Sequence, residues 1–278
     1  MRSTLLPSAF SGGTCRRASE EVDMGKSDLP LNGQTALVTG ASSGIGRRFA
    51  AILAAVGAKV VVAARRTDRL AALVAEIEGE GGMAAAVELD VADPDSIAAA
   101  IDAAERAFGR ITILINNAGV ADVADATDIG LAAIDHMTTV NLRGPFLLAR
   151  EVARRLIADG APGRIVNVSS IVAYTYDGHV PVAYYAMTKA AIVRMTEVLA
   201  VEWAKYFINV NAIAPGFVVT EMNQEVVEEK GVALASRRAR GRLTQPANLD
   251  STLLYLVSPD SGYVTGSCIR LDDGQMPR

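Results

Sequence analysis

Short apolar runs rich in β-branched residues alternate with longer helical segments along most of this chain. No other feature restricts the fold as strongly. The runs occur at 35–39, 59–63, 84–89, 111–115, 164–168, 208–213 and 268–271. Between them, segments such as 69–79 and 95–108 show helical periodicity, and "DPDS" supplies a cap and a first-turn proline for the second. Continuous apolar strands separated by helices predict a doubly wound α/β domain with a seven-stranded parallel sheet flanked by helices.

The domain boundaries follow from composition. Residues 31–278 are predicted to form this single domain, because no Pro/Gly/Ser-rich linker divides them. Within the domain, 217–240 is predicted to be a mobile helical flap over the substrate. Residues 1–30 are predicted to be a disordered leader, or one mis-assigned upstream of a true start at Met24, because they could not bury a core of their own. Three arginines and no acid in residues 1–19 leave a transit peptide as the alternative.

Composition excludes several classes of partner. A formal net charge of −4 over 278 residues does not indicate the basic surface that nucleic-acid binding requires. The apolar stretch 49–64 is shorter than the roughly 20 residues that a membrane helix needs. Two cysteines and two histidines, with no metal-like spacing, predict neither a disulfide framework nor a metal site. A cytoplasmic protein with no nucleic-acid, membrane or metal partner is therefore expected.

A glycine-rich turn, "TGASSGIG", follows the first apolar run and leads into a helix. Gly40 would permit the tight turn, Gly44 would let the backbone approach a pyrophosphate, and Gly46 would allow close helix–strand packing. The first two glycines are separated by three residues, unlike the common G-x-G-x-x-G pattern. The residues predicted to bind a dinucleotide here are Gly40, Ser42, Ser43, Gly44, Ile45 and Gly46.

The end of the second apolar run indicates which nicotinamide cofactor binds. An acid that binds the ribose hydroxyls often stands there, but this chain has Ala64, followed by Arg65 and Arg66. Arginines suit a 2′-phosphate, so NADP(H) is favoured and NAD(H) remains possible. The alternative is that Asp68 binds the ribose while both arginines are merely solvated.

Two further apolar runs end in polar or small residues that could contact the same cofactor. In "LDV", Asp90 and Val91 are predicted to flank the adenine. In "NNAG", Asn117, Ala118 and Gly119 are predicted to line the ribose and to let the cofactor lie close to the backbone.

The stretch "AYYAMTK" contains two adjacent tyrosines and one lysine. On a helix, Tyr185 shares a face with Lys189, four residues on, whereas Tyr184 shares a face with Thr188. A nearby ammonium favours the phenolate, so Lys189 is predicted to lower the pKa of Tyr185 from its usual value of about 10. Tyr185 is thus the predicted proton donor.

The motifs "TGASSGIG", "NNAG", "NVSS", "YYAMTK" and "NAIAPGFVVT", in this order, resemble those of the short-chain dehydrogenase/reductase family from Leu31 to Gly274. The resemblance implies a Rossmann-like fold and an oxidoreductase that transfers hydride between a nicotinamide cofactor and a carbonyl or secondary alcohol. It implies that the catalytic residues are Asn141, Ser170, Tyr185 and Lys189. It also implies that the nicotinamide carboxamide is fixed near Pro215, Gly216, Val218 and Thr220.

The family's mechanism assigns a role to each catalytic position. Ser170 and Tyr185 would hydrogen-bond the carbonyl, and Tyr185 would protonate its oxygen. Lys189 would also hold the nicotinamide ribose, and Asn141 would anchor a water that returns the proton through Lys189. Family members commonly pair helices equivalent to 141–158 and 183–205, so a homodimer or homotetramer is expected.

The segment 171–182, between Ser170 and Tyr185, is expected to line the substrate pocket and is slightly longer than usual for the family. Its apolar and aromatic wall would comprise Val172, Tyr174, Tyr176 and His179. For His179, an exposed position in the loop is favoured over contact with the substrate.

Three alternative functions fit the sequence less well. The first is a 3-oxoacyl-thioester reductase. The family's acyl-carrier-protein reductases carry basic residues near two places where this chain has Ala161 and Tyr206. This difference disfavours an acyl-carrier-protein substrate but leaves a free acyl thioester open. An NADPH-binding regulator without catalysis conflicts with the four filled catalytic positions. A hydrolase using Ser170, Asp177 and His179 would lack the G-x-S-x-G elbow.

Overall fold

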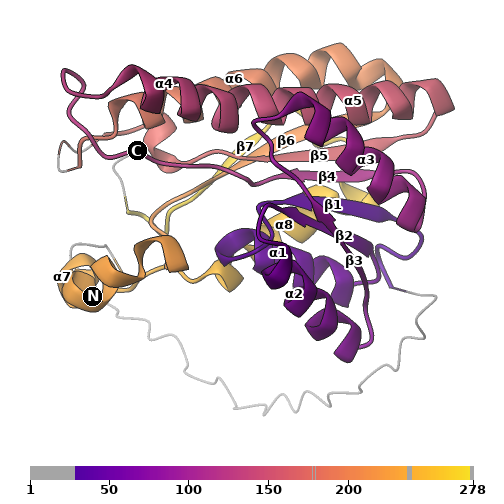
Figure 1. Cartoon of the computed structure of the whole chain (residues 1–278), viewed down its shortest axis with the longest axis horizontal. Coiled ribbons are helices and arrows are strands. Elements are labelled where there is room, and N and C mark those ends of the chain that lie inside the picture. The colour runs from indigo at the N-terminus through magenta and orange to yellow at the C-terminus, as the bar shows by residue number, and fades with distance from the viewer. Residues whose placement is uncertain (1–28, 177, 179, 237–239, 276–278) are drawn as a thin grey trace, which may run out of the picture.

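The computed structural model describes residues 29–176, 178, 180–236 and 240–275. Its central feature is one sheet in which all neighbouring strands are parallel, in the order β3-β2-β1-β4-β5-β6-β7 (Figure 1). The strands are β1 Thr35–Thr39, β2 Lys59–Ala64, β3 Met83–Glu88, β4 Ile113–Asn116, β5 Gly163–Val168, β6 Ile208–Pro215 and β7 Cys268–Leu271. The predicted seven-stranded parallel sheet is confirmed, with strand ends within two residues of those expected.

Helices cover both faces of the sheet. They are α1 Gly44–Ala55, α2 Thr67–Gly79, α3 Pro94–Phe108, α4 Leu131–Thr138, α5 Gly144–Asp159, α6 Ala183–Trp203, α7 Gln224–Ser236 and α8 Asp250–Val257. One hydrophobic core lies under α1, α2 and α8, and the other under α3, α5 and α6 (Figure 1). Within β1, Ala36 and Val38 belong to the first core and Leu37 to the second, as the alternation of side chains along a strand requires.

Local sequence explains the element boundaries. The α3 helix begins as "DPDS" predicts, since the Asp93 side chain accepts a hydrogen bond from Asp95 N and Pro94 occupies the first turn. The α4 and α5 helices are joined by a π-helical turn, Thr139–Arg143, so the chain runs helically from Leu131 to Asp159 with one wider turn inside it. Such π turns are frequent at functional sites.

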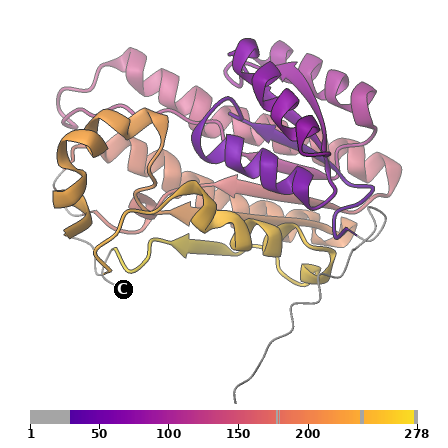
Figure 2. The ribbon, with the colours of Figure 1, turned by 90° about the horizontal axis from the view of Figure 1, so that it is seen from below.

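The order of the strands reverses at β1, which has β2 on one side and β4 on the other. In parallel sheets of this kind, ligands bind beyond the carboxyl ends of the strands at that point. The α7 helix stands beside the sheet at the end toward which β7 points (Figure 2). Of the predicted flap 217–240, residues 224–236 are therefore helical, and 237–239 lie outside the described residues.

The predicted leader lies outside the described residues except for Leu29 and Pro30. None of the helices in the described ranges combines the length and the apolar character that a bilayer-crossing segment needs.

Candidate active site

The glycine-rich turn lies between β1 and α1, directly against the residues that follow β4. Gly40 has φ +66°, and a Cβ there would lie 2.9 Å from the Cα of Ala118, so both the conformation and the space require glycine. Asn117 holds the two segments together, because its backbone N donates to Thr39 Oγ1 at 3.0 Å and its side chain donates to Thr39 O at 2.9 Å. The turns after β1 and β4 therefore form one rigid edge.

The amino terminus of α1 opens at this edge. Ser43 is its N-cap, and within the described chain the Ser43 side chain makes no capping hydrogen bond. The first turn carries no acidic residue. Ile45 packs on the core below, and Gly46 lies against the side chain of Asn117. The first N–H groups and the positive end of the helix dipole are thus left for an anion, which fits a pyrophosphate.

Arginines surround the turn. Arg66 Nη2 donates to the hydroxyls of Ser42 and Ser43, each at 2.9 Å, so its guanidinium lies over the glycine-rich turn. Arg65 and Asp68 are exposed beside it. The predicted 2′-phosphate site therefore has a positive charge held in place by Ser42 and Ser43.

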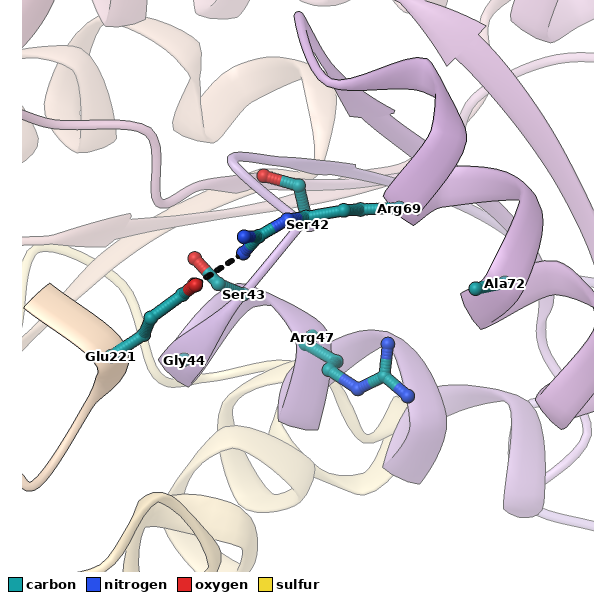
Figure 3. Close-up of a pocket in the computed structure, with 7 residues that line it drawn as sticks. All are labelled: Ser42, Ser43, Gly44, Arg47, Arg69, Ala72 and Glu221. Atoms are coloured by element: carbon teal, nitrogen blue, oxygen red, sulfur yellow. Dashed lines mark hydrogen bonds and ion pairs between the residues drawn. The ribbon is translucent and has the colours of Figure 1, made fainter.

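An acid from the far end of the chain enters the same region (Figure 3). Glu221, just before α7, lies 2.5 Å from Arg69 Nη1 and 3.7 Å from Arg66 Nη1. The hydrogen bond from Arg69 lowers the pKa of the Glu221 carboxyl. A hollow of about 360 Å³ is lined by Ser42, Ser43, Gly44, Arg47, Arg69, Ala72 and Glu221. Sequence reasoning missed the pair, since 152 residues separate its members.

The residues predicted to flank adenine have internal partners. Asp90 Oδ1 accepts a hydrogen bond from Ala92 N at 2.9 Å, which stabilises the turn after β3. Val91 is buried against Gly144. Their contact with adenine stays a prediction.

Ser170, Tyr185 and Lys189 meet where β5 ends. The hydroxyls of Ser170 and Tyr185 are hydrogen-bonded. Ser169 faces the other way, and its hydroxyl donates to Lys189 O at 2.8 Å, as strand alternation predicts. Lys189 Nζ donates to Val168 O at 3.0 Å and lies 5.6 Å from the centre of the Tyr185 ring.

Burial dominates the protonation of this cluster. Lys189 is only 5% exposed, and burial lowers its pKa to about 8. Burial also raises the pKa of Tyr185, while the hydrogen bond with Ser170 lowers it in part. The predicted net lowering of the Tyr185 pKa is therefore wrong for this chain on its own, because burial has the larger effect. Removal from water penalises phenolate and ammonium alike, an effect that helical spacing does not report.

Asn141 lies in the π-helical turn and is buried. Its side chain donates to Val120 O and accepts from Val120 N, both at 2.8 Å, and it also donates to Thr188 Oγ1 at 3.2 Å. A Cβ on Gly119 would lie 3.3 Å from Asn141 Oδ1 and 3.4 Å from Lys189 Nζ, so these three residues adjoin. Both the oxygen and the nitrogen of the Asn141 amide are thus hydrogen-bonded to the protein. The water that Asn141 is expected to anchor stays a prediction.

The segment after β6 returns to the glycine-rich turn. Pro215 ends the strand, and Gly216 lies against Asp272 and Gln275. Val218 is buried and bridges to Thr244. The Thr220 methyl lies close to Gly44, since a Cβ on that glycine would be 3.2 Å away. Thr220 thus lies beside the turn, and its role toward a carboxamide stays a prediction.

The expected substrate wall is only partly assembled. Val172 is half-buried in a short 3-10 helix, Ile171–Ala173, and Tyr176 is exposed. Tyr174 instead packs against the start of β7, hydrogen-bonded to Cys268 and 5.3 Å from the Arg270 guanidinium carbon. His179 lies outside the described residues.

Comparison with known proteins identifies the family. The model of the short chain dehydrogenase family matches residues 34–231. D-threitol dehydrogenase from Mycolicibacterium smegmatis is 36% identical over 249 residues, which cover 89% of this chain and 94% of the relative. A 3-oxoacyl-[acyl-carrier-protein] reductase from Thermotoga maritima is 36% identical over 246 residues, which cover 88% of this chain and 99% of the relative.

Solved structures agree. A short-chain type dehydrogenase/reductase from Mycobacterium marinum superposes with a TM-score of 0.86 at 35% identity, covering 91% of this chain and all of that one. A protein from Agrobacterium tumefaciens with bound NADP superposes with a TM-score of 0.81 at 34% identity, covering 90% of this chain and 99% of that one. Sequence, fold and strand order together establish that the chain belongs to the short-chain dehydrogenase family of oxidoreductases, which act on alcohols and carbonyls.

Proposed function

We propose that this chain interconverts a carbonyl compound and a secondary alcohol with NADP(H), and that Tyr185 is the proton donor. One observation carries the proposal. The hydroxyls of Ser170 and Tyr185 are hydrogen-bonded at the carboxyl edge of the sheet, with the ammonium of Lys189 buried close by. Lys189 also adjoins Gly119, in the segment that packs on the glycine-rich turn. Chemistry and dinucleotide binding can therefore meet at one edge.

Each of these residues has its own role in the reduction. When bound, the nicotinamide supplies the hydride for reduction. Ser170 and Tyr185 hold the carbonyl oxygen, and Tyr185 donates its proton to the alkoxide that forms there. Burial keeps Tyr185 protonated at neutral pH, and an alkoxide is far more basic than a phenolate, so this transfer is favourable. Lys189, with a pKa of about 8, is largely charged at pH 7 and stabilises the phenolate left behind.

The preference for NADP(H) rests on charge. Arg66 is fixed over the turn by Ser42 and Ser43, and Arg65 lies exposed beside it. Ala64 stands where an acid would bind the ribose of NAD(H). The family likeness to an NADP-bound structure supports the same cofactor. NAD(H) is the alternative to be compared directly.

Two substrate classes are supported by the likeness to known relatives. A sugar alcohol or its ketone is favoured by the likeness to D-threitol dehydrogenase, and a 3-oxoacyl thioester by the likeness to the Thermotoga maritima reductase. We further propose a homo-oligomer paired through α5 and α6. Apolar side chains that include the exposed Phe146 and Val198 line a hollow of about 410 Å³ on these helices.

The test is oxidation of NADPH and NADH with a panel of ketones, ketoses and 3-oxoacyl thioesters, and the reverse reaction with secondary alcohols. We expect Tyr185→Phe to lower turnover about 10³-fold, the size of a lost general acid, with unchanged affinity for NADPH. Tyr255→Phe is the matched control, because it removes a half-exposed hydroxyl from α8 on the opposite face of the sheet. Full activity in Tyr185→Phe would refute the assignment.

A further inference from the structure

The tyrosine next to the proposed proton donor has a partner of its own. The hydroxyls of Tyr184 and Thr138 lie 2.7 Å apart. Because Thr138 Oγ1 already donates to Ile134 O at 2.8 Å, Tyr184 must be the donor to Thr138. This bond ties the first turn of α6 to the last residue of α4.

A second tie lies one helical turn further along. Thr188 Oγ1 accepts from Asn141 Nδ2 at 3.2 Å and donates to Tyr185 O at 2.8 Å. Both Thr188 and Asn141 are buried. The hydroxyl of Thr188 therefore connects the π-helical turn to the backbone of Tyr185.

The two ties act on one face of α6. Tyr184 and Thr188 are four residues apart, and their partners Thr138 and Asn141 are three apart, so each pair lies along one side of its helix. Two points one turn apart on α6 are held to a neighbouring helical segment. They restrict both its sliding and its rotation about its own axis.

The residues that follow these two in sequence are Tyr185 and Lys189. A small rotation of α6 would move the Tyr185 hydroxyl away from Ser170, and Lys189 Nζ away from Val168 O and Gly119. Misplacement of a reacting group by about 1 Å can lower a rate by two orders of magnitude. The reacting groups therefore depend on contacts that they do not make themselves.

We propose that Tyr184 and Thr188 are positioning residues, which fix the rotation of α6 by hydrogen-bonding Thr138 and Asn141 and so align Tyr185 and Lys189. This inference rests on the proposed function for its activity test, but it also predicts a property of the protein without cofactor or substrate. Neither residue is required to touch the substrate.

The first experiment is a double-mutant cycle on Tyr184→Phe and Thr138→Val. Each variant keeps the packed side chain and removes one hydroxyl. We expect each to lower kcat about tenfold, with KM and NADPH affinity within about twofold, and the double variant to lose no more than either single variant. Tyr255→Phe should match the wild type. Unchanged kcat, or losses that multiply in the double variant, would overturn the Tyr184 tie.

The second experiment compares two substitutions of the buried tie. Thr188→Val keeps the shape but removes the hydroxyl, and we expect kcat to fall about 10²-fold. Thr188→Ser keeps the hydroxyl and should stay within about threefold of the wild type. Equal losses in both variants would show that the methyl group, not the hydrogen bond, matters, and would overturn the role of Thr188.

A third measurement needs no turnover. The Tyr185 phenol is titrated in the cofactor-free protein by ¹³C-tyrosine NMR, with Tyr185→Phe assigning its resonance. The Ser170 hydrogen bond lowers the Tyr185 pKa, so a rotated α6 in Tyr184→Phe or Thr188→Val should raise it. An unchanged titration overturns the inference. If the wild type reduces nothing in the panel, the proposed function fails while this titration still decides the inference.

Discussion

At the glycine-rich turn the polar groups are exposed arginines that contact hydroxyls and a carboxylate, whereas around β5 and α6 the polar groups are buried. The side chains of Arg66, Arg69 and Glu221 are largely exposed, and Arg66 contacts Ser43 and the buried Ser42 from the outside. Lys189 and Asn141 are instead enclosed and bonded largely to backbone atoms. Both regions belong to the same edge of one sheet.

The difference has an energetic consequence. Exposed ion pairs contribute little to stability, because water and salt replace either partner readily. The Lys189 ammonium has no carboxylate partner among the residues that the structure describes, and a buried charge of that kind opposes folding. We therefore expect changes at the phosphate end to alter affinity alone, and changes at the reacting end to alter turnover and stability together.

Among the substitutions that test this contrast, Lys189→Met should have the largest effect. Turnover should fall about 10³-fold, since the variant loses the charge beside Tyr185. Stability should rise at pH 7. Lowering the pKa from 10.5 to about 8 corresponds to about 3 kcal/mol, and leaving Val168 O without its donor returns about 1 kcal/mol, for a net gain of about 2 kcal/mol.

The pH dependence of that gain fixes its cause. The folded pKa of Lys189, about 8, lies below its value in the unfolded chain, so the unfolded state binds more protons between about pH 8 and 10.5. The free energy of unfolding of the wild type, relative to that of Lys189→Met, should therefore rise between about pH 8 and 10.5. The difference in stability between the two proteins should shrink accordingly. Urea denaturation at pH 7 and pH 10 measures this, with the exposed Lys205→Met as control. A less stable Lys189→Met at pH 7 would mean that the ammonium is compensated.

Ser170→Ala should have the next largest effect. Removing a donor to the reacting oxygen lowers turnover about 10²-fold, and NADPH affinity should not change. The neighbouring Ser169→Ala is the matched control, because its hydroxyl bonds to Lys189 O and not to Tyr185. It should reduce stability by about 1 kcal/mol and turnover by far less. If Ser169→Ala is the more damaging to kcat, the two serines have been assigned the wrong way round.

The two regions also differ in how far sequence could predict them. Continuous apolar runs predicted the seven strands, and helical spacing identified Tyr185, not Tyr184, as the tyrosine on the same helix face as Lys189. Both patterns involve residues that are close in sequence. Contacts between distant residues leave no such pattern. Arg69 and Glu221, and likewise Tyr184 and Thr138, are brought together by the fold.

Burial is the other quantity that spacing could not supply. The sequence placed a lysine one turn from a tyrosine and predicted a lowered phenol pKa, but both groups are withdrawn from water, and burial raises it instead. Tyr174 shows the same limit. Its loop position predicted a place in the substrate wall, which stays a prediction, and no sequence pattern indicated its contacts with Cys268 and Arg270 of β7.

At the phosphate end, Arg65→Ala and Arg66→Ala should each weaken NADPH binding about 30-fold and NADH binding by less than twofold. A charge-assisted hydrogen bond to a phosphate accounts for a change of that size. Calorimetry with both nucleotides measures it, and the exposed Arg106→Ala on α3 is the control. The contrast between the regions breaks down if kcat falls as much as affinity. Equal losses for the two nucleotides would contradict the 2′-phosphate assignment.

The smallest expected effect belongs to Glu221→Gln. The Glu221 carboxylate forms a close ion pair with Arg69 and a longer one with Arg66. An incoming phosphate must therefore compete with this carboxylate for the arginines. Removing that charge should tighten NADPH binding about threefold at low salt, leave NADH unchanged, and lose its effect as salt screens the surface. Glu225→Gln, another exposed acid nearby in sequence, should change neither. Weaker NADPH binding in Glu221→Gln would mean that the acid holds the arginines in place for the phosphate, and the phosphate end would then be preorganised in the same way as the reacting end.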